Sequence, residues 1–271
     1  MKRAFGLSDV GRVRKGNEDS FAYDEGLHLY VVADGMGGHN AGEVASRLAV
    51  DAMVGFIQRT QGDSEWSWPY GVDPTLSYDA NRLRSAIYLA NRRVFRAAED
   101  RDDYTGMGTT VVAVMLTDTT AIVGHVGDSR VYLLDSEALH RLTQDDSWAA
   151  TVLPQELGND AAAIARHPMR NVLTNVLGVR EQTQIHLAEF PLKGEEVLLL
   201  CSDGLHGSLE DVNITEIIKA GGADLQGTSR KLIDAALDGG SRDNVTALLI
   251  KCPPITEAAT RIAPAPPAET A

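Results

Sequence analysis

Four short apolar segments of this 271-residue chain each have an aspartate at one end, and this recurrence restricts the fold more than any other feature. Asp34 follows LYVVA, Asp203 follows VLLLCS, Asp128 follows IVGHVG, and Asp243 comes just before VTALLI. A single Asp-Gly or Gly-Asp pair is ordinary turn chemistry, because Asp bonds to its own backbone and Gly accepts positive φ. If four strand tips reach one edge of a sheet, however, their carboxylates repel unless divalent cations neutralise them.

The apolar segments indicate antiparallel sheets covered by helices, an α+β fold. Apolar residues spaced four apart predict long helices over 44–57 and 83–98, and a third is expected over 229–237. The predicted strands cluster between the helices instead of alternating with them; they cover 29–33, 110–116, 121–126, 131–134, 197–201 and 245–251. Hairpin-like turns are expected at 117–119 and 127–129.

The folded part is expected to end near Cys252, which gives one domain over 1–252. Residues 253–271 hold five of the ten prolines and read as a disordered Pro/Ala-rich tail. Residues 60–78, with Trp66, Trp68 and Tyr70, and residues 143–178 are expected to be irregular. Long loops are often functional, but aromatics that cap the core edge are the favoured interpretation of 60–78.

Charge and sequence pattern exclude several classes of protein. The chain has 38 Asp and Glu against 25 Lys and Arg, a net charge of −13, so neither nucleic acid nor an anionic membrane surface is expected to bind it. Metal cations remain compatible with this acidity. The N-terminus has no apolar signal region and no segment is long enough to span a bilayer, so a cytoplasmic location is expected.

The sequence excludes two other phosphate-binding motifs, because each lacks residues that its chemistry requires. The glycine spacing that begins at Gly37 resembles a Walker A loop, but Glu43 and Val44 replace its Lys and Ser/Thr. Cys201 begins CSDGLHG, with Gly207 where a thiol phosphatase loop needs arginine, so this thiol is expected in the core.

Eight ordered segments of the chain resemble the bacterial PPM-type (2C-type) metal-dependent serine/threonine protein phosphatases. They span residues 8–250 and read SDVGRVRKGNEDSF, VVADGMGGHNAGEVAS, GMGTTVVAVML, HVGDSRVYLL, LTQDDSW, HPMRNVLTNVLG, LLLCSDGLHGSLED and DNVTALLI. The resemblance implies an α/β/β/α four-layer sandwich, in which two antiparallel sheets are flanked by helices. It also implies two divalent metal ions, Mn or Mg, in a cleft at one end of the sandwich.

By this resemblance, the metal ligands are Asp34, which bridges both ions, the Gly35 carbonyl, Asp203 and Asp243. Asp128 would support a third, weaker metal. A hydroxide that bridges the two ions would attack phosphorus directly, without a covalent intermediate.

The resemblance also assigns two residues outside the metal ligands. Asp19 would orient metal-bound water, and Arg14 would bind the substrate phosphate. Arginine suits that role because its planar fork meets two phosphate oxygens at once.

The chain departs from the family at three places. Met36 occupies the position at which some members carry a general-acid histidine, and His39 is a weaker candidate for that role or a structural histidine. Asp146, in LTQDDSW, stands where the family usually has histidine. Residues 143–178 correspond to the mobile flap beside the active site, which would tune substrate access and third-metal occupancy.

The sequence therefore predicts a cytoplasmic phosphatase that acts on phosphoserine and phosphothreonine in proteins. Its expected partners are phosphoproteins, above all a cognate Ser/Thr kinase and its substrates, and a monomer is expected. The alternatives are a catalytically silent regulatory binding module of the same fold and a small-molecule phosphohydrolase. A silent module would be expected to lack Asp34, Asp203 or Asp243, and all three are present.

Overall fold

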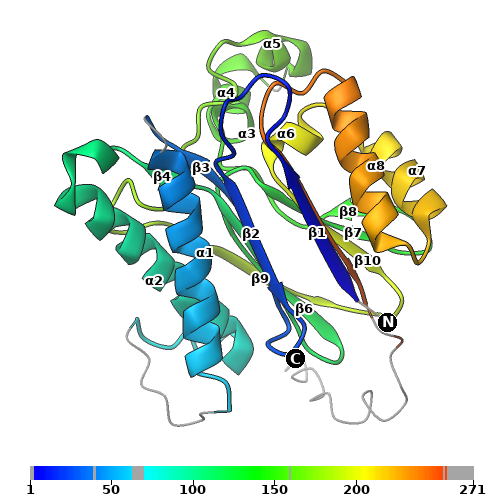
Figure 1. Cartoon of the computed structure of the whole chain (residues 1–271), viewed down its shortest axis with the longest axis horizontal. Coiled ribbons are helices and arrows are strands. Elements are labelled where there is room, and N and C mark those ends of the chain that lie inside the picture. The colour runs from blue at the N-terminus through cyan, green and yellow to red at the C-terminus, as the bar shows by residue number, and fades with distance from the viewer. Residues whose placement is uncertain (1–2, 39–40, 63–69, 159, 253, 255–271) are drawn as a thin grey trace, which may run out of the picture.

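Two antiparallel sheets packed face to face form the centre of the computed structural model, and helices cover both outer faces (Figure 1). The structure describes every residue except 1–2, 39–40, 63–69, 159, 253 and 255–271. His39, Trp66, Trp68 and nearly all of the predicted tail therefore lie outside the described residues. The expected four-layer α+β sandwich is confirmed.

The first sheet has five strands in the order β1-β11-β10-β7-β8. These strands are β1 (Ala4–Asp9), β11 (Val245–Lys251), β10 (Val197–Cys201), β7 (Arg130–Leu134) and β8 (Leu139–Arg141). The second sheet has the order β2-β3-β5-β6-β9, and the short β4 pairs with the end of β3. Its strands are β2 (Asp19–Asp24), β3 (Leu29–Met36), β4 (Gly108–Thr109), β5 (Val111–Leu116), β6 (Thr120–Val126) and β9 (His186–Pro191).

Strict alternation along the central strands divides the core into layers. In β3, Tyr30 and Val32 face the opposite sheet, whereas the residues between them face the helices. In β10, Leu198 and Leu200 likewise point between the sheets. Both faces of these strands are apolar because both are buried, which explains why the sequence shows continuous apolar runs instead of a polar alternation.

Two long helices, α1 (Ala41–Arg59) and α2 (Tyr78–Asp100), cover the second sheet, and α7 (Asp211–Gly221) and α8 (Leu225–Asp238) cover the first. A 3-10 turn, η1 (Asp102–Tyr104), follows α2. The α2 helix begins at a Ser77 cap whose hydroxyl accepts the amide of Ala80. No helix among the described residues combines the length and apolar content that crossing a bilayer requires.

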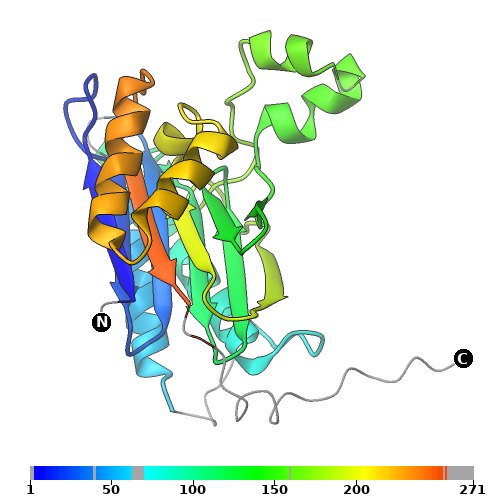
Figure 2. The same cartoon turned by 90° about the vertical axis from the view of Figure 1, so that its right-hand side faces the viewer.

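Residues 143–178 contain more regular structure than expected. Three short helices lie in this flap, namely α3 (Trp148–Thr151), α4 (Leu153–Leu157) and α5 (Ala161–Arg166). Figure 2 shows them standing off one end of the sandwich. The sequence did not reveal them because each is shorter than the window in which helical periodicity is visible.

One predicted hairpin is wrong. The turn at 117–119 does join the paired strands β5 and β6, but the turn at 127–129 joins β6 to β7, which belong to different sheets. Gly127 has φ +100, a value that favours glycine, and the chain crosses here from one sheet to the other. Asp128 consequently lies at the junction between the two sheets.

Candidate metal and phosphate site

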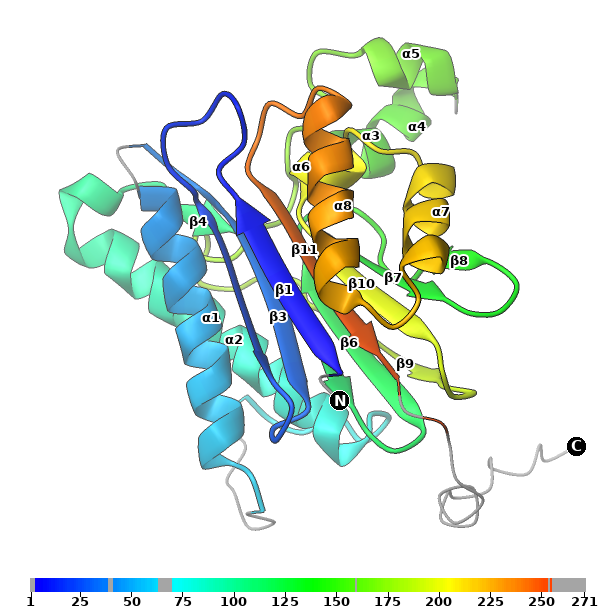
Figure 3. The same cartoon turned by 45° about the vertical axis from the view of Figure 1, so that its right-hand side comes forward.

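The loops that carry the predicted acids meet at one end of the sandwich. In Figure 3 the loop between β1 and β2, the start of β11, α6 (Asp203–His206) and the flap all lie toward this end. Asp34 is in β3, Asp128 is in the crossover turn, Asp203 begins α6, and Asp243 lies two residues before the start of β11. The structure thus brings the strand ends and loops that carry these four acids to the same end of the sandwich.

Electrostatics show how close these acids are. Burial, followed by the charges of Asp19, Asp203, Asp128 and Asp243, raises the pKa of Asp34 well above its ordinary range. The Asp34 side chain also lies close enough to Asp203 to influence the pKa of Asp203. Several carboxylates in one poorly solvated region cannot all ionise without a compensating positive charge.

The pKa values of Asp128 and Asp203 are raised in the same environment. Burial, followed by the charges of Asp203 and Asp145, raises the pKa of Asp128 to about 7. Burial and then the charge of Asp243 also raise the pKa of Asp203. The region that contains these side chains is therefore built to favour either protons or cations.

Asp19 joins the two sheets beneath these acids. Its Oδ2 accepts hydrogen bonds from the hydroxyls of Ser202, at 2.7 Å, and Thr246, at 2.6 Å. Asp19 lies on β2 in the second sheet, whereas Thr246 lies on β11 in the first. Because Ser202 directly precedes Asp203, these bonds fix the base of the site. Burial raises the pKa of Asp19 to about 6, against the opposing effect of the two hydroxyls.

Asp34 is fixed through its backbone by the Thr109–Thr110 pair. Its N–H donates to Thr110 Oγ1 at 3.1 Å, and its carbonyl accepts from the Thr110 N–H at 2.8 Å. Thr110 Oγ1 also lies 2.7 Å from Ser129 Oγ. Thr110 thus connects Asp34 to the turn that holds Asp128.

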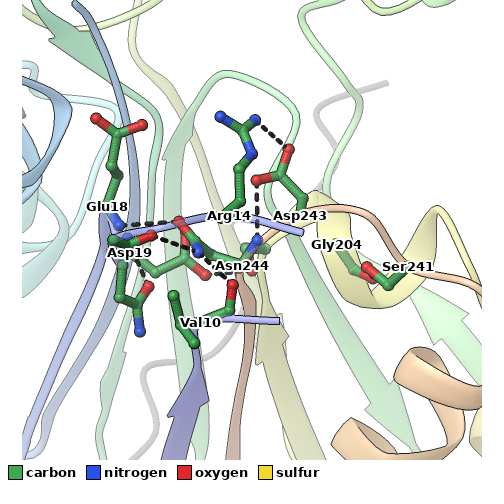
Figure 4. Close-up of polar contacts among 11 residues, drawn as sticks. Val10, Arg14, Glu18, Asp19, Gly204, Ser241, Asp243 and Asn244 are labelled. Carbon is green, nitrogen blue, oxygen red and sulfur yellow. Dashed lines mark hydrogen bonds and ion pairs between the residues drawn. The ribbon is translucent and has the colours of Figure 1, made fainter. Parts of the chain in front are cut away.

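Arg14 and Asp243 lie together in an ion pair. Figure 4 shows the Arg14 guanidinium against the Asp243 carboxylate, with the NH2 group 2.7 Å from Oδ2. Asn244 joins the loop between β1 and β2, which carries Arg14, to the segment that carries Asp243. Its side chain accepts from the Glu18 N–H at 2.8 Å and donates to the carbonyl of Val10 at 2.9 Å.

A glycine allows the loops of Asp203 and Asp243 to approach each other. A Cβ at Gly204 would lie 2.0 Å from the carbonyl oxygen of Asn244, so no larger residue fits there without displacement of the backbone. The Ser241 hydroxyl donates to the Gly204 carbonyl at 2.8 Å and so adds a hydrogen bond between the same two loops. The glycine after Asp203 therefore has a packing role beyond turn chemistry.

A cavity of about 280 Å³ separates Asp128 and Asp203 from the flap. Its wall includes Arg130, Arg170 and His206. The imidazole Nε2 of His206 lies 3.0 Å from the carbonyl oxygen of Asp128. Burial lowers the pKa of His206 to about 4, so this ring is neutral at physiological pH and can act as a fixed hydrogen-bond donor.

The donor set fits divalent cations by its chemistry. Asp19 and Asp203 each have a buried carboxylate oxygen, Oδ1, that lacks a hydrogen-bond partner in the described part of the chain. Hard cations such as Mg²⁺ and Mn²⁺ prefer carboxylate oxygens of this kind. Within the ranges that the structure describes, no three acidic, histidine or cysteine side chains are arranged to hold one ion as they stand; the Asp243 carboxylate is instead turned to Arg14.

The anchoring residues were not predicted from the sequence. Thr110, Ser202, Asn244 and Thr246 lay inside quoted segments, but their roles were not assigned. Serine, threonine and asparagine are common at strand ends for many reasons, so only the fold reveals which of them bond to the acids. His39, the weak general-acid candidate, is outside the described residues.

Comparison with known proteins gives a consistent result. The model of a family described as "Protein phosphatase 2C" matches residues 12–220. A "Serine/threonine phosphatase stp" from Listeria monocytogenes is 33% identical over 252 residues, which cover 90% of this chain and 93% of that protein. "Protein phosphatase PhpP" from Streptococcus pneumoniae is 32% identical over 248 residues, which cover 90% and 95%.

Solved structures agree with the sequence relatives. The Mycobacterium tuberculosis serine/threonine phosphatase PstP/Ppp superposes with a TM-score of 0.79 at 32% identity, over 93% of this chain and 98% of that one. A structure described as the catalytic domain of PstP in complex with two manganese ions gives a TM-score of 0.75 at 31% identity, with the same coverage.

Proposed function

This chain belongs to the protein phosphatase 2C family, and we propose that Asp34, Asp203 and Asp243 hold the two divalent ions of a metal-dependent protein serine/threonine phosphatase. The Gly35 carbonyl completes this ligand set, and Asp128 supports a third, weaker ion. The observation that carries the proposal is the convergence of these acids, with an unpartnered buried oxygen on Asp203 and a pKa of Asp34 raised by burial and by its acidic neighbours.

Two divalent ions, when bound, supply Lewis acidity that offsets the charge of the phosphate and makes water nucleophilic at neutral pH. The side chains around them contribute binding and orientation. Arg14 binds two phosphate oxygens through its planar fork. Oδ1 of Asp19 has no protein donor among the described residues and is free to accept a hydrogen bond from water.

The proposed substrates are phosphoserine and phosphothreonine in proteins, and we propose a cognate Ser/Thr kinase and its targets as the physiological partners. The relatives are named serine/threonine phosphatases, which supports this substrate class. A catalytically silent module is not favoured, because none of the three principal acids has been replaced.

The decisive experiment measures hydrolysis of a phosphothreonine peptide with EDTA or with Mn²⁺. We expect activity only with metal, and we expect Asp203→Asn to reduce it at least about 100-fold even at saturating Mn²⁺, because one ligand of the ion is weakened. Asp118→Asn is the matched control, since it removes the same charge at an exposed turn. Full turnover by Asp203→Asn would refute the assigned role.

A further inference from the structure

Asp145 and Asp146, at the start of the flap, form hydrogen bonds to residues on both sides of Asp128 in its turn. On one side, the Asp145 carboxylate accepts two hydrogen bonds from Arg130, from Nε at 3.0 Å and from NH2 at 2.7 Å. On the other side, Oδ2 of Asp146 accepts the Gly127 N–H at 3.0 Å, and the Asp146 N–H donates to the Gly127 carbonyl at 3.0 Å. Asp128 lies between these two anchored residues.

Asp146 also bonds to the far end of the flap and to the second sheet. Its Oδ2 accepts from Asn175 Nδ2 at 2.8 Å, and its Oδ1 lies 2.9 Å from His186 Nε2 on β9. Its backbone carbonyl accepts the Thr174 N–H at 2.8 Å. The side chain is only 9% exposed. A carboxylate is costly to bury unless it is well bonded, and here both oxygens have partners.

Asn175 in turn forms part of the wall of a groove. Its Nδ2 also donates to the Gln184 carbonyl at 2.8 Å, and its Oδ1 accepts from Thr183 at 2.7 Å. A groove of about 560 Å³ is lined by these residues, and Met36 lies on it as well. Met36 is the last residue of β3 and lies two residues beyond Asp34, so the groove borders the strand end that carries this acid.

Aspartate suits this junction better than a histidine would. A carboxylate has two oxygens and accepts from Gly127, Asn175 and His186 at the same time, whereas a neutral imidazole has one acceptor nitrogen. The bonds from the flap to the Asp128 turn and to β9 therefore depend on the two acceptor oxygens of Asp146.

We propose that Asp146 is a positioning residue that couples the groove beside Met36 to the Asp128 turn, so that a phosphoprotein segment in the groove and a divalent ion at Asp128 strengthen each other's binding. The inference rests on the proposed function, because it takes the groove as the place of the residues that flank the phosphate. Such coupling is reciprocal: if the peptide tightens the ion, the ion tightens the peptide by the same factor.

The first test compares wild type, Asp146→Ala and the control Asp118→Asn by calorimetric titration with Mn²⁺. We expect Asp146→Ala to weaken the weakest Mn²⁺ site roughly 10-fold, as is usual when a residue that orients a ligand is lost, and to leave the two tighter sites unchanged. A non-hydrolysable phosphothreonine-mimic peptide should tighten the weak site in wild type but not in Asp146→Ala.

Steady-state kinetics and hydrogen exchange separate positioning from general damage. Asp146→Ala should raise KM for a phosphothreonine peptide but not for a small aryl phosphate, which does not fill the groove. In metal-free protein, the Gly127 amide and residues 173–177 should exchange faster. Asp146→Asn should recover most of each property, because its oxygen accepts from Gly127 and its amide donates to the other tautomer of His186.

The proposal is overturned if peptide and weak-site Mn²⁺ show the same coupling in wild type and Asp146→Ala, or if Asp146→Asn is as defective as Asp146→Ala. Should Asp146→Ala fail to fold, Asn175→Ala takes its place, because it removes the bond between the groove wall and Asp146. Unchanged coupling between the peptide and the weak Mn²⁺ site in that variant would overturn the proposal. Wild type that bound Mn²⁺ but hydrolysed no phosphopeptide would contradict the proposed function instead, and the exchange experiment would still report on Asp146.

Discussion

The ion pair between Arg14 and Asp243 joins two side chains with different proposed tasks. Arg14 is assigned to the substrate phosphate and Asp243 to a metal ion, yet NH2 and Oδ2 are 2.7 Å apart. Their side chains are 48% and 36% exposed. An ion pair this open is worth no more than about 1 kcal/mol, so a phosphate group and a divalent cation can each displace it.

At the residue scale, replacement of Arg14 by alanine should affect substrate binding. We expect KM for a phosphothreonine peptide to rise by about 10- to 100-fold, equivalent to about 1.5–3 kcal/mol for a lost hydrogen bond to a charged group. The fall in kcat should be much smaller. Arg12→Ala is the matched control, because Arg12 pairs with Asp238 instead. An unchanged KM would show that Arg14 does not bind the phosphate.

The family resemblance assigned the four acids to metal ions, and they could be picked out from the sequence because an aspartate recurs at the end of four apolar runs, although each alone reads as turn chemistry. Their anchors could not. Thr246 donates to Asp19 from a strand that is apolar apart from its last residue, Lys251, and its hydroxyl has no sequence signature that separates it from an ordinary β-branched strand residue. Asp146 was noticed only as a departure from the family, and the three groups that bond to its carboxylate, one of them a backbone N–H, lie 19, 29 and 40 positions away.

At the element scale, β6 and β9 carry a histidine pair next to the flap. His125 and His186 are register partners, and their rings stack with centroids 4.8 Å apart. His125 Nε2 lies 2.8 Å from the Gln144 carbonyl. Burial lowers the pKa of His125 below its ordinary value, although this hydrogen bond acts in the opposite direction. The folded protein therefore holds His125 neutral at pH values where the unfolded chain binds a proton.

The sign of the resulting pH effect is determined. Stability should fall as pH drops below about 6.5, the ordinary histidine pKa, and the loss should continue until the folded pKa is reached. The slope from one such proton is at most about 1.4 kcal/mol for each pH unit. His125→Gln keeps a donor for Gln144 and does not titrate, so urea unfolding between pH 7 and pH 5 should give a flatter dependence. The exposed His140→Gln is the control, and equal slopes for wild type and His125→Gln would contradict the argument.

The strands that the sequence predicted are those buried on both faces. The ranges 197–201 and 245–251 match β10 and β11 residue for residue. By contrast, β1, β2, β8 and β9 were missed, and most of their residues are partly buried or exposed. Such strands contain polar residues on the open side and resemble loops in composition.

At the scale of the whole molecule, the acid cluster opposes folding unless a cation offsets it. Loops from both sheets bring the carboxylates together, and repulsion among them is present only in the folded chain. Divalent ions that bind the folded chain alone must therefore stabilise it by mass action.

The two-sheet sandwich as a whole was predicted by the resemblance to a family. The residue patterns alone predicted only clustered antiparallel strands covered by helices.

The melting temperature should accordingly depend on metal. Mn²⁺ at 100 times its dissociation constant adds about 2.7 kcal/mol for one site, which corresponds to a rise of roughly 5–10 °C for a protein of this size. Asp203→Asn should melt higher than wild type in EDTA, because one repelling charge is gone, and should gain less from Mn²⁺. Identical melting temperatures of wild type in EDTA and in Mn²⁺ would contradict this account.

The central claim is that Asp34, Asp203 and Asp243 bind two divalent ions between the loops of the two sheets. Anomalous diffraction from crystals grown with Mn²⁺ tests it most directly. The account predicts two strong anomalous peaks in contact with these carboxylates, with Asp243 turned from Arg14 toward one of them. Peaks elsewhere on the molecule, or no peak among these side chains at saturating Mn²⁺, would contradict it.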